Sequence, residues 1–218
     1  MIFAPHQDDE TLGCGGVIAL KRQQEIPVSV VFLTDGQASH RGHPRLKPSE
    51  LGKIRKQEAL TALDVIGVEK SNIYFLEEPD GQLAQIPLKK REELVNKLIK
   101  LLQTINPQEV FITYRQDMSS DHETAYTLVR EAVLRSEIEV EIFQYPIWRL
   151  WQMQTFDFRS PELSSAYRLS IKKVLHKKKQ ALAAYKSQYL PLRNWNKIPL
   201  SPEFLERLSS DYEIFFKV

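Results

Sequence analysis

Short apolar runs that end in polar residues recur along the chain. Residues 26–36 (IPVSVVFLTDG), 73–81 (IYFLEEPDG) and 109–115 (EVFITYR) each place β-branched and apolar side chains before turn or charged residues. Short, nearly continuous apolar runs of this kind are typical of strands that are buried on both faces of a sheet. The pattern therefore predicts three strands that each end in a loop.

Amphipathic stretches separate these runs. Residues 13–24 follow the first apolar run, residues 48–66 begin with Pro-Ser-Glu, and residues 88–104 place leucine and isoleucine at helical spacing opposite many charges. Strands and helices that alternate in this way predict an α/β fold, a Rossmann-like three-layer sandwich with a mostly parallel sheet and helices on both faces. The carboxyl ends of the strands then share one edge, where ligands bind in open α/β sheets.

The two ends of the chain fit this pattern less well. Only residues 2–4 precede the first polar loop, against about 5 to 6 residues in a typical strand, so the sequence leaves open whether the first strand is truncated. Residues 141–218 are less regular, and we expect a basic helix at 168–188 and a closing strand at 212–218. Without repeats or a low-complexity linker, residues 1–218 are expected to form a single domain.

The composition is that of an ordinary globular protein, with 42% hydrophobic and 27% charged residues. A net charge of +2 argues against a general nucleic-acid-binding surface, and no stretch approaches the roughly 20 apolar residues that cross a bilayer. The single cysteine, Cys14, excludes an internal disulfide, and no signal peptide is recognised. We therefore expect a cytoplasmic protein without a nucleic-acid partner or transmembrane segment, and leave a homo-oligomer open.

A histidine and three carboxylates, in HQDDE at 6–10, follow the first apolar run. Like charges this close repel each other, and a helix dipole accounts for Glu10 and in part for Asp9, but not for the whole cluster. Imidazole and carboxylate groups suit a divalent cation such as zinc, which offsets the repulsion. A catalytic zinc commonly takes three protein ligands, so another strand end should supply one, and His122, after the strand at 109–115, is the best candidate.

These segments resemble the motifs of a known enzyme family. PHQDDETLGCGG at 5–16 is similar to the first motif of the LmbE-like, or PIG-L-like, zinc deacetylases, and Asp121-His122 resembles the end of their second motif, H-x-D-H. The segments at 54–83 and 177–188 resemble further parts of the family, so the similarity extends from residue 1 to about residue 190. The chain is thus identified as a GlcNAc-PI de-N-acetylase-like member of this family.

The resemblance implies a zinc-dependent hydrolase of carbohydrate metabolism that removes an N-acetyl group from an N-acetylglucosamine-type amino sugar or glycoconjugate through a zinc-activated water. By match to the motifs, it implies His6, Asp9 and His122 as metal ligands and Asp8 as the catalytic general base. Another divalent metal such as Fe²⁺ suits the same ligand types, and Fe(II) oxygenases also use two histidines and one carboxylate. The alternative is a metal-containing glycan-binding or scaffold protein with weak or no hydrolase activity.

Other positions match the family pattern or depart from it. Arg55 and Asp80 match positions that contact substrate hydroxyls, although a surface salt bridge and a turn aspartate explain them about as well. Asp121 is expected to orient a metal ligand from outside the ligand set. Gln7 replaces the usual proline of the first motif, and Ser119 stands where the second motif has its first histidine. The departure at Ser119 is the more serious one, because that histidine is thought to assist the oxyanion or the leaving group.

Further side chains could contribute to the site. His40, His43 and His176 could each replace the missing imidazole, although solvent exposure is the more common state for such residues. The aromatic-rich stretch 148–156 indicates core or subunit packing, or a surface on which a sugar stacks. The glycines at 13–16 do not complete a dinucleotide-binding fingerprint, and we expect them to permit close helix packing behind the loop.

Overall fold

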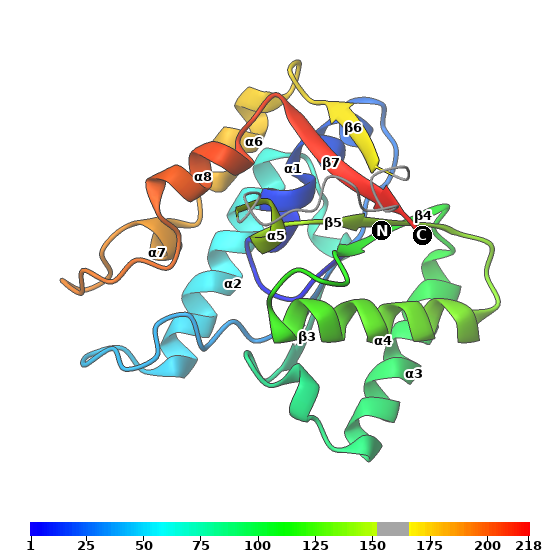
Figure 1. Ribbon diagram of the computed structural model, residues 1–218, viewed down its shortest axis with the longest axis horizontal. Helices are drawn as coiled ribbons and strands as arrows, with labels where there is room; N and C mark the ends of the chain where they lie inside the picture. Colours follow the sequence, from blue (N-terminus) through cyan, green and yellow to red (C-terminus); the bar gives the residue numbers. More distant parts are fainter. Residues whose placement is uncertain (152–165) are drawn as a thin grey trace.

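A sheet of seven strands, in the order β3-β2-β1-β4-β5-β7-β6, runs through the middle of the protein (Figure 1). The structure, a computed structural model, describes residues 1–151 and 166–218, so the end of the aromatic stretch 148–156 lies outside the described residues. The strands are β1 (Ile2–Ala4), β2 (Val30–Thr34), β3 (Ile73–Glu78), β4 (Glu109–Thr113), β5 (Glu141–Tyr145), β6 (Ala166–Ser170) and β7 (Tyr212–Lys217). Strands β1 to β5 are parallel, and β7 pairs antiparallel with both β5 and β6.

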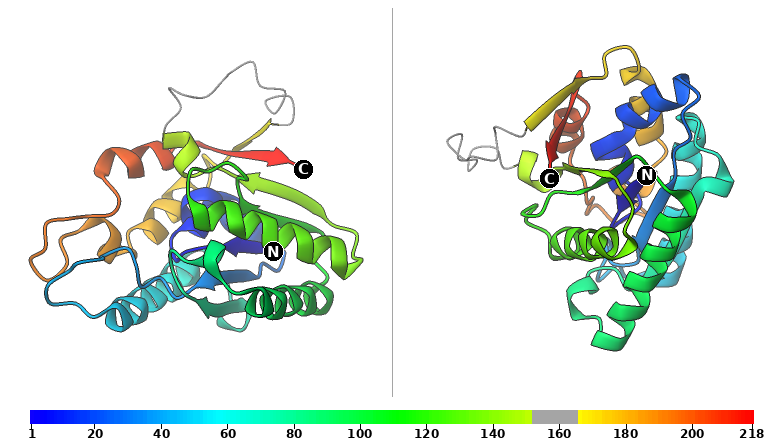
Figure 2. Two further views of the ribbon diagram at one scale, coloured as in Figure 1. Left: turned by 60° about the horizontal axis from the view of Figure 1, so that its bottom comes forward. Right: turned by 90° about the vertical axis from the view of Figure 1, so that its right-hand side faces the viewer.

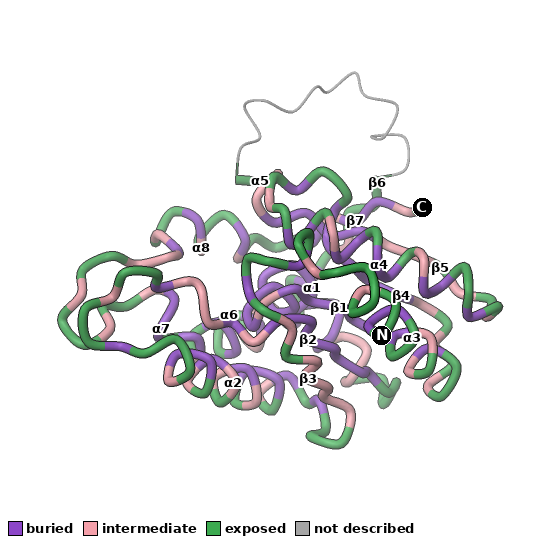
Figure 3. The backbone as a smooth tube through the Cα atoms, turned by 90° about the horizontal axis from the view of Figure 1, so that it is seen from below, coloured by how far each residue is buried: buried purple, intermediate pink, exposed green. Residues whose placement is uncertain are grey.

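Helices cover both faces of this sheet (Figure 2). One face packs against α1 (Asp9–Gln23), α2 (Pro48–Val65), α6 (Leu175–Leu182) and α8 (Pro202–Leu208), and the other against α3 (Leu88–Ile105) and α4 (Ser120–Ser136). The short helices are α5 (Trp148–Trp151), α7 (Lys186–Tyr189), and the 3-10 turns η1 (Lys70–Asn72) and η2 (Leu83–Gln85). The buried strands form the centre of the molecule (Figure 3), which confirms the predicted three-layer α/β sandwich.

Strand β1 shows how the sequence pattern produces the two layers. Ile2 and Ala4 pack into the core beneath α1 and α2, whereas Phe3 packs into the core beneath α3 and α4. Successive side chains of a strand point to opposite faces, and all three residues are buried because helices cover both. None of the helices within 1–151 and 166–218 is long and apolar enough to span a membrane.

The expected helix at 168–188 is wrong in its first part. Residues Ala166–Ser170 form strand β6, and the helix begins only at Leu175. The ladder that β6 forms with β7 joins residues more than 40 positions apart, and the Arg168 guanidinium lies over the Tyr212 ring at 3.6 Å. Nonlocal pairing of this kind overrides the local helical pattern of the sequence.

The strand order places a crevice between β1 and β4. Strands β2 and β3 follow on one side of β1, and β4 and β5 follow on the other, so the chain crosses the sheet in opposite directions from this point. The carboxyl ends of strands at such a switch point are the usual ligand site of doubly wound sheets. The loop after β1 carries residues 5–8 to this edge, and the loop after β4 carries residues 114–119 to it.

Helix α1 packs closely on the structure behind this loop, as its glycines predict. A Cβ atom at Gly13 would lie 2.1 Å from Cδ2 of Tyr145, and one at Gly16 would lie 2.4 Å from Cγ2 of Ile171. Both distances are far below van der Waals contact. The glycines are therefore required by close approach, which confirms the prediction of tight packing behind the loop.

A buried ion pair, between Lys178 and Glu213, contacts the backbone of the same helix. Glu213 accepts hydrogen bonds from the backbone N–H groups of Gly16 at 2.7 Å and Val17 at 2.8 Å. The Lys178 ammonium donates to Glu213 at 2.8 Å and to the carbonyl oxygen of Leu12, also at 2.8 Å. Lys178 thus belongs to the core, although it lies within the stretch expected to form a basic helix.

Gly13→Ala should lower the free energy of unfolding by about 1–2 kcal/mol. Overpacking typically costs about 1–3 kcal/mol, and the better helix propensity of alanine offsets at most about 1 kcal/mol. Gly15→Ala is the matched control, because its Cβ would lie 3.1 Å from Cγ of Lys178 and 3.3 Å from Cγ2 of Thr11, distances that need only small shifts of the neighbours. Urea unfolding of the two variants measures the difference. Equal midpoints for Gly13→Ala and wild type would contradict the packing described here.

Candidate metal centre

The loop between β1 and α1 is anchored to the end of β2. The carbonyl oxygen of Pro5 accepts hydrogen bonds from the backbone N–H of Thr34 at 3.0 Å and from its hydroxyl at 2.8 Å. The side chain of Gln7 donates to the carbonyl oxygen of Thr34 at 2.8 Å. Gln7, which replaces the proline of the family motif, therefore provides a tether of its own to the neighbouring strand.

Asp8 has an unusual backbone conformation, with φ of 143° and ψ of −29°. Residues other than glycine rarely adopt positive φ, and such strain costs on the order of 1–3 kcal/mol. Two contacts hold it in place. The backbone N–H of Asp8 donates to the Glu10 carboxylate at 3.1 Å, and its Oδ1 atom accepts from Arg55 at 3.1 Å. Glu10 is itself fixed in the core by the hydroxyl of Tyr185.

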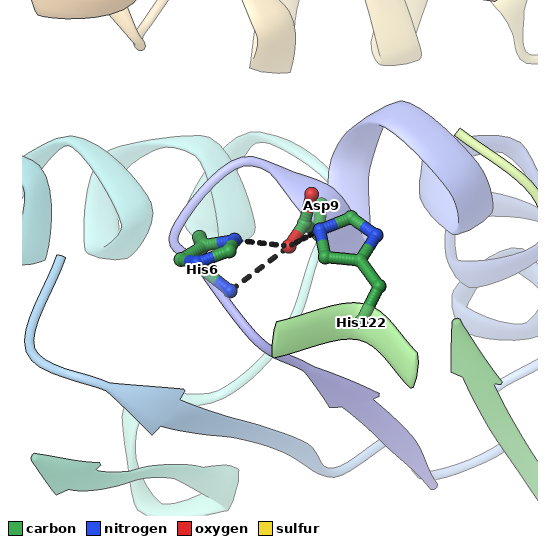
Figure 4. A group of neighbouring side chains, drawn as sticks. All are labelled: His6, Asp9 and His122. Atoms are coloured by element: carbon green, nitrogen blue, oxygen red, sulfur yellow. Dashed lines mark hydrogen bonds and ion pairs between the residues drawn. The ribbon is translucent and has the colours of Figure 1, made fainter. Parts of the chain in front are cut away.

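Three side chains converge beside Asp8 (Figure 4). The Oδ2 atom of Asp9 lies 3.1 Å from Nδ1 of His6 and 3.2 Å from Nε2 of His122, which comes from the first turn of α4. One potential ligand atom from each of these residues lies within 4.8 Å of the other two. The Nε2 atom of His122 is completely buried, and its contact with Asp9 is at ion-pair distance without hydrogen-bond geometry. A buried imidazole nitrogen that faces a carboxylate without a well-formed hydrogen bond fits the ligand set of a divalent ion.

A second group, formed by His6, Asp80 and Asp121, also brings three potential ligand atoms together. Both of its carboxylates already accept backbone hydrogen bonds. Asp121 accepts from Gly81 N at 2.6 Å and Leu83 N at 3.1 Å, and Asp80 accepts from Ala38 N at 2.8 Å. Asp9 also accepts a backbone hydrogen bond, from His6 N at 2.9 Å, so these bonds do not separate the two groups. The group with two histidines is the better candidate because two imidazole nitrogens and one carboxylate are a common ligand set of catalytic zinc.

Carboxylates also contact the second ring nitrogen of each histidine, the one that does not face Asp9. Nε2 of His6 lies 3.1 Å from Asp80 and 3.2 Å from Asp121, and Nδ1 of His122 lies 2.7 Å from Asp117. Such contacts fix the orientation of a ligating ring and raise its basicity. Asp121 therefore lies where an orienting residue was expected.

Asp117 was not identified from the sequence. Its carboxylate is fully buried and accepts the backbone N–H groups of residues 147 and 149 at 2.9 Å and of residue 148 at 3.3 Å, in addition to contacting His122. Its position five residues before His122, in the loop after β4, is the one signal in the sequence. These bonds connect the end of β5 to the histidine.

Asp117→Asn should raise the dissociation constant of the metal by about 10–100-fold, the usual cost of losing an orienting partner. The amide removes the negative charge opposite Nδ1 of His122 and places an NH₂ group against the backbone donors of residues 147–149. Competition with a zinc chelator measures the change. Asp64→Asn, on the exposed face of α2, is the matched control, and an unaltered affinity in Asp117→Asn would exclude the orienting role.

The carboxylates around the loop favour the protonated, positively charged forms of the two histidines. Burial alone would lower the pKa of His122, but Asp9 and Asp117 raise it to about 9. Burial opposes the charged form of His6 as well, yet Asp121, Asp80 and Asp9 hold its pKa well above the usual range. Both shifts favour protonated rings in the absence of an ion, and a bound cation would take the place of these protons.

Asp8 differs from Asp9 in its electrostatic surroundings. Burial raises the pKa of Asp8 to about 7, against the opposing effect of the Arg55 guanidinium. Burial also acts to raise the pKa of Asp9, but His122 and His6 hold it well below its usual range. Adjacent carboxylates with separated pKa values suit different roles, one as a permanent anion and one as a group that exchanges a proton.

Arg55 and Asp80 both line the cavity above these residues, but they also contact the loop itself. Arg55 is only 3% exposed, and it donates to the carbonyl oxygen of Gln7 at 2.8 Å as well as to Asp8. Asp80 contacts His6 and lies 3.8 Å from Arg55. Contact of either residue with a substrate stays a prediction, whereas contact with the loop is direct.

Ser119 occupies the residue before α4, makes no capping hydrogen bond with its side chain, and lines the same cavity, half-buried. Of the histidines considered as replacements, His43 contacts the carbonyl oxygen of Leu192 at 2.9 Å, His40 contacts Ser39 at 3.0 Å, and His176 is exposed on α6. None of the three is among the described residues that line the cavity. The hydroxyl group of Ser119 therefore stands where the family motif has an imidazole.

The cavity has a volume of about 510 Å³. The candidate metal ligands His6 and Asp9 line it together with Asp8. The rest of the wall is largely apolar and includes Leu12, Met118, Ile147, Trp148, Pro199 and Leu200. Trp148, from the aromatic stretch, therefore lies on the cavity wall and also packs on Phe204 in the core, with ring centroids 4.9 Å apart.

The chain is similar to known proteins in sequence and in structure. The PIG-L (GlcNAc-PI de-N-acetylase) family model matches residues 1–133. The probable N-acetyl-alpha-D-glucosaminyl L-malate deacetylase 2 of Bacillus subtilis (strain 168) is 29% identical over 150 residues, which cover 64% of this chain and 62% of that protein. The match thus spans less than two thirds of the relative.

Solved structures share the fold. The N,N'-diacetylchitobiose deacetylase of Pyrococcus horikoshii has a TM-score of 0.73 at 23% identity, covering 100% of this chain and 82% of that one. The 4-carboxy-2-hydroxymuconate hydratase of Pseudomonas putida KT2440 has a TM-score of 0.72 at 16% identity, covering 99% and 93%. Proteins named for different reactions share this architecture, so structural likeness alone does not assign one. The family model matches more than half of the chain, and the protein belongs to the PIG-L (GlcNAc-PI de-N-acetylase) family.

Proposed function

We propose that the protein is a zinc-dependent N-deacetylase that removes the acetyl group from an N-acetylglucosamine-type amino sugar or glycoconjugate. The observation that carries the proposal is the convergence of His6, Asp9 and the buried Nε2 atom of His122 beside a cavity that Asp8 also lines. Family membership supports the reaction class.

In this proposal His6, Asp9 and His122 hold the ion. The two nitrogens and one oxygen are a common ligand set of catalytic zinc, and leave a position open. Zinc bound there lowers the pKa of a water and polarises a carbonyl group. Fe²⁺ accepts the same ligands, so metal analysis of the purified protein decides between the two ions.

Asp8 acts as the general base and then as the general acid. Its Oδ1 atom is held by Arg55, and no hydrogen bond from residues 1–151 or 166–218 occupies Oδ2. The free oxygen takes a proton from the attacking water. It returns this proton to the nitrogen of the amide when the C–N bond breaks, so that acetate and a free amine are formed. The raised pKa of Asp8 supports both transfers.

Arg55 and Asp80 are proposed to contact sugar hydroxyl groups as well as the loop, because both line the cavity. Asp121 and Asp117 orient the two histidines from behind. Ser119 takes the place of an imidazole on the cavity wall, so less assistance to the oxyanion or the leaving group is available from this position.

The direct test is a panel of N-acetyl amino sugars and their glycosides, incubated with the zinc-loaded protein and assayed for free amine. We expect turnover of N-acetylglucosaminides that stops when the metal is removed. A fully metal-loaded protein that binds these sugars but releases no amine would instead support the glycan-binding alternative.

A further inference from the structure

A basic, exposed side chain, Arg41, lines the same cavity as His6, Asp8 and Asp9. Its Nη2 atom donates to the carbonyl oxygen of Asp80 at 3.4 Å, and the carboxylate of Asp80 lies 3.1 Å from His6. Within the described chain, Arg41 makes no other side-chain hydrogen bond and has no carboxylate within ion-pair distance. An arginine has five donors in a planar fork, so most of them are available to a ligand in the cavity.

The backbone at residue 81 makes room for this guanidinium. Gly81 has φ of +77°, and a Cβ atom there would lie 2.5 Å from Nη2 of Arg41. The absence of a side chain therefore lets the guanidinium lie directly on the chain segment that follows β3. This contact places Arg41 on the same side of the cavity as His6 and Asp80.

The loop that carries Arg41 is braced by a second loop. Nε2 of His43 contacts the carbonyl oxygen of Leu192 at 2.9 Å, and Arg193 donates to the carbonyl oxygen of Arg45 at 2.7 Å. The rings of His43 and Trp195 lie 4.9 Å apart. The two loops extend from the same side of the molecule (Figure 2). A side chain presented by a braced loop loses less freedom when it binds a ligand.

We propose that Arg41 binds an anionic group, a carboxylate or a phosphate, that the amino sugar carries away from its acetamide. The inference rests on the proposed function and defines the substrate class more narrowly. The acetamide must lie beside Asp8 and the proposed metal ligands, so a guanidinium elsewhere in the cavity lining contacts another part of the molecule. Planar oxyanions accept two parallel hydrogen bonds from an arginine, which gives both affinity and orientation.

The test uses four N-acetylglucosaminides with the zinc-loaded protein: the carboxymethyl and 2-phosphoethyl glycosides, and their neutral carbamoylmethyl and 2-hydroxyethyl counterparts. We expect the anionic member of at least one pair to have a kcat/KM about tenfold higher than its neutral counterpart in the wild type. Whether the carboxylate or the phosphate pair shows the preference identifies the anion. In Arg41→Ala the preference should disappear, and in Arg41→Lys it should be partly retained, because the ammonium keeps the charge without the fork. Arg45→Ala, which alters an exposed arginine of the same loop outside the cavity lining, should keep the wild-type ratio.

Equal kcat/KM within each pair in the wild type would overturn the inference, as would an equal loss for anionic and neutral substrates in Arg41→Ala. Calorimetric binding of the same glycosides to the zinc-loaded Asp8→Asn variant separates this inference from the proposed function. A tenfold binding preference that depends on Arg41, without turnover by the wild type, would contradict the hydrolase and support the anion site. Equal binding of charged and neutral glycosides would refute the role of Arg41.

Discussion

Asp8→Asn should lower the turnover of an N-acetylglucosaminide by about 100- to 10,000-fold, the usual contribution of a general acid–base group, and leave the bound zinc in place. The amide has the size of the carboxylate and can still accept the hydrogen bond of Arg55, but it cannot take a proton from water. Asparagine also tolerates positive φ better than most residues, so the backbone of the loop should be preserved.

Two measurements on the same sample decide this prediction. Metal content by mass spectrometry should equal that of the wild type, and free-amine release should be almost lost. Asp64→Asn, an identical change on the exposed face of α2, should retain both. Wild-type turnover by zinc-loaded Asp8→Asn would show that another group, or the metal alone, removes the proton.

His122→Ala should lose the metal and the turnover together. The variant removes one of the three proposed ligands, so its dissociation constant for zinc should rise by more than about 100-fold, beyond the usual effect of an orienting residue. This outcome differs from that of Asp8→Asn, which should keep the metal and lose only the turnover. His122 is completely buried, so the alanine also leaves a space in the core.

Unfolding in the presence of a chelator is the control for the loss of packing in His122→Ala. It compares the free energies of unfolding of the wild type and the variant without metal. His176→Ala, an exposed histidine on α6, controls for nonspecific binding of zinc to imidazole. Unchanged zinc affinity in a folded His122→Ala variant would place the metal elsewhere, for example at the group of His6, Asp80 and Asp121.

Much of the centre is encoded locally in the sequence. His6, Asp8 and Asp9 lie within four residues of each other at a strand end, and the edge of a parallel sheet brings His122 to them from the end of another strand. The fold class could be predicted for the same reason, because apolar runs and amphipathic stretches such as α3 are periodic in sequence.

Residues that act through distant partners could not be predicted in the same way. Asp117 orients His122 only because the backbone of residues 147–149, after β5, turns its N–H groups toward the carboxylate. Arg55 matches a substrate position of the family, yet its direct contact with Asp8 depends on how α2 packs across the loop. Strand β6 was missed because its partner β7 lies more than 40 residues further along the chain.

The first motif and the second motif support the proposal to different degrees. The first places the proposed base, Asp8, and two proposed ligands, His6 and Asp9, in a tethered, strained loop whose residues contact each other or the end of β2. The second provides His122 and Asp121 but has Ser119 on the cavity wall. The chemistry that the site supports therefore depends on the metal and on Asp8 more than on a second general acid.

The most direct test of the account is a zinc titration of the metal-stripped protein, with free-amine release from an N-acetylglucosaminide as the readout. The account predicts no turnover without metal, an activity that rises with added zinc and levels off at one equivalent per chain, and no recovery in His122→Ala. Turnover by the metal-free protein at the rate of the zinc-loaded protein would contradict it.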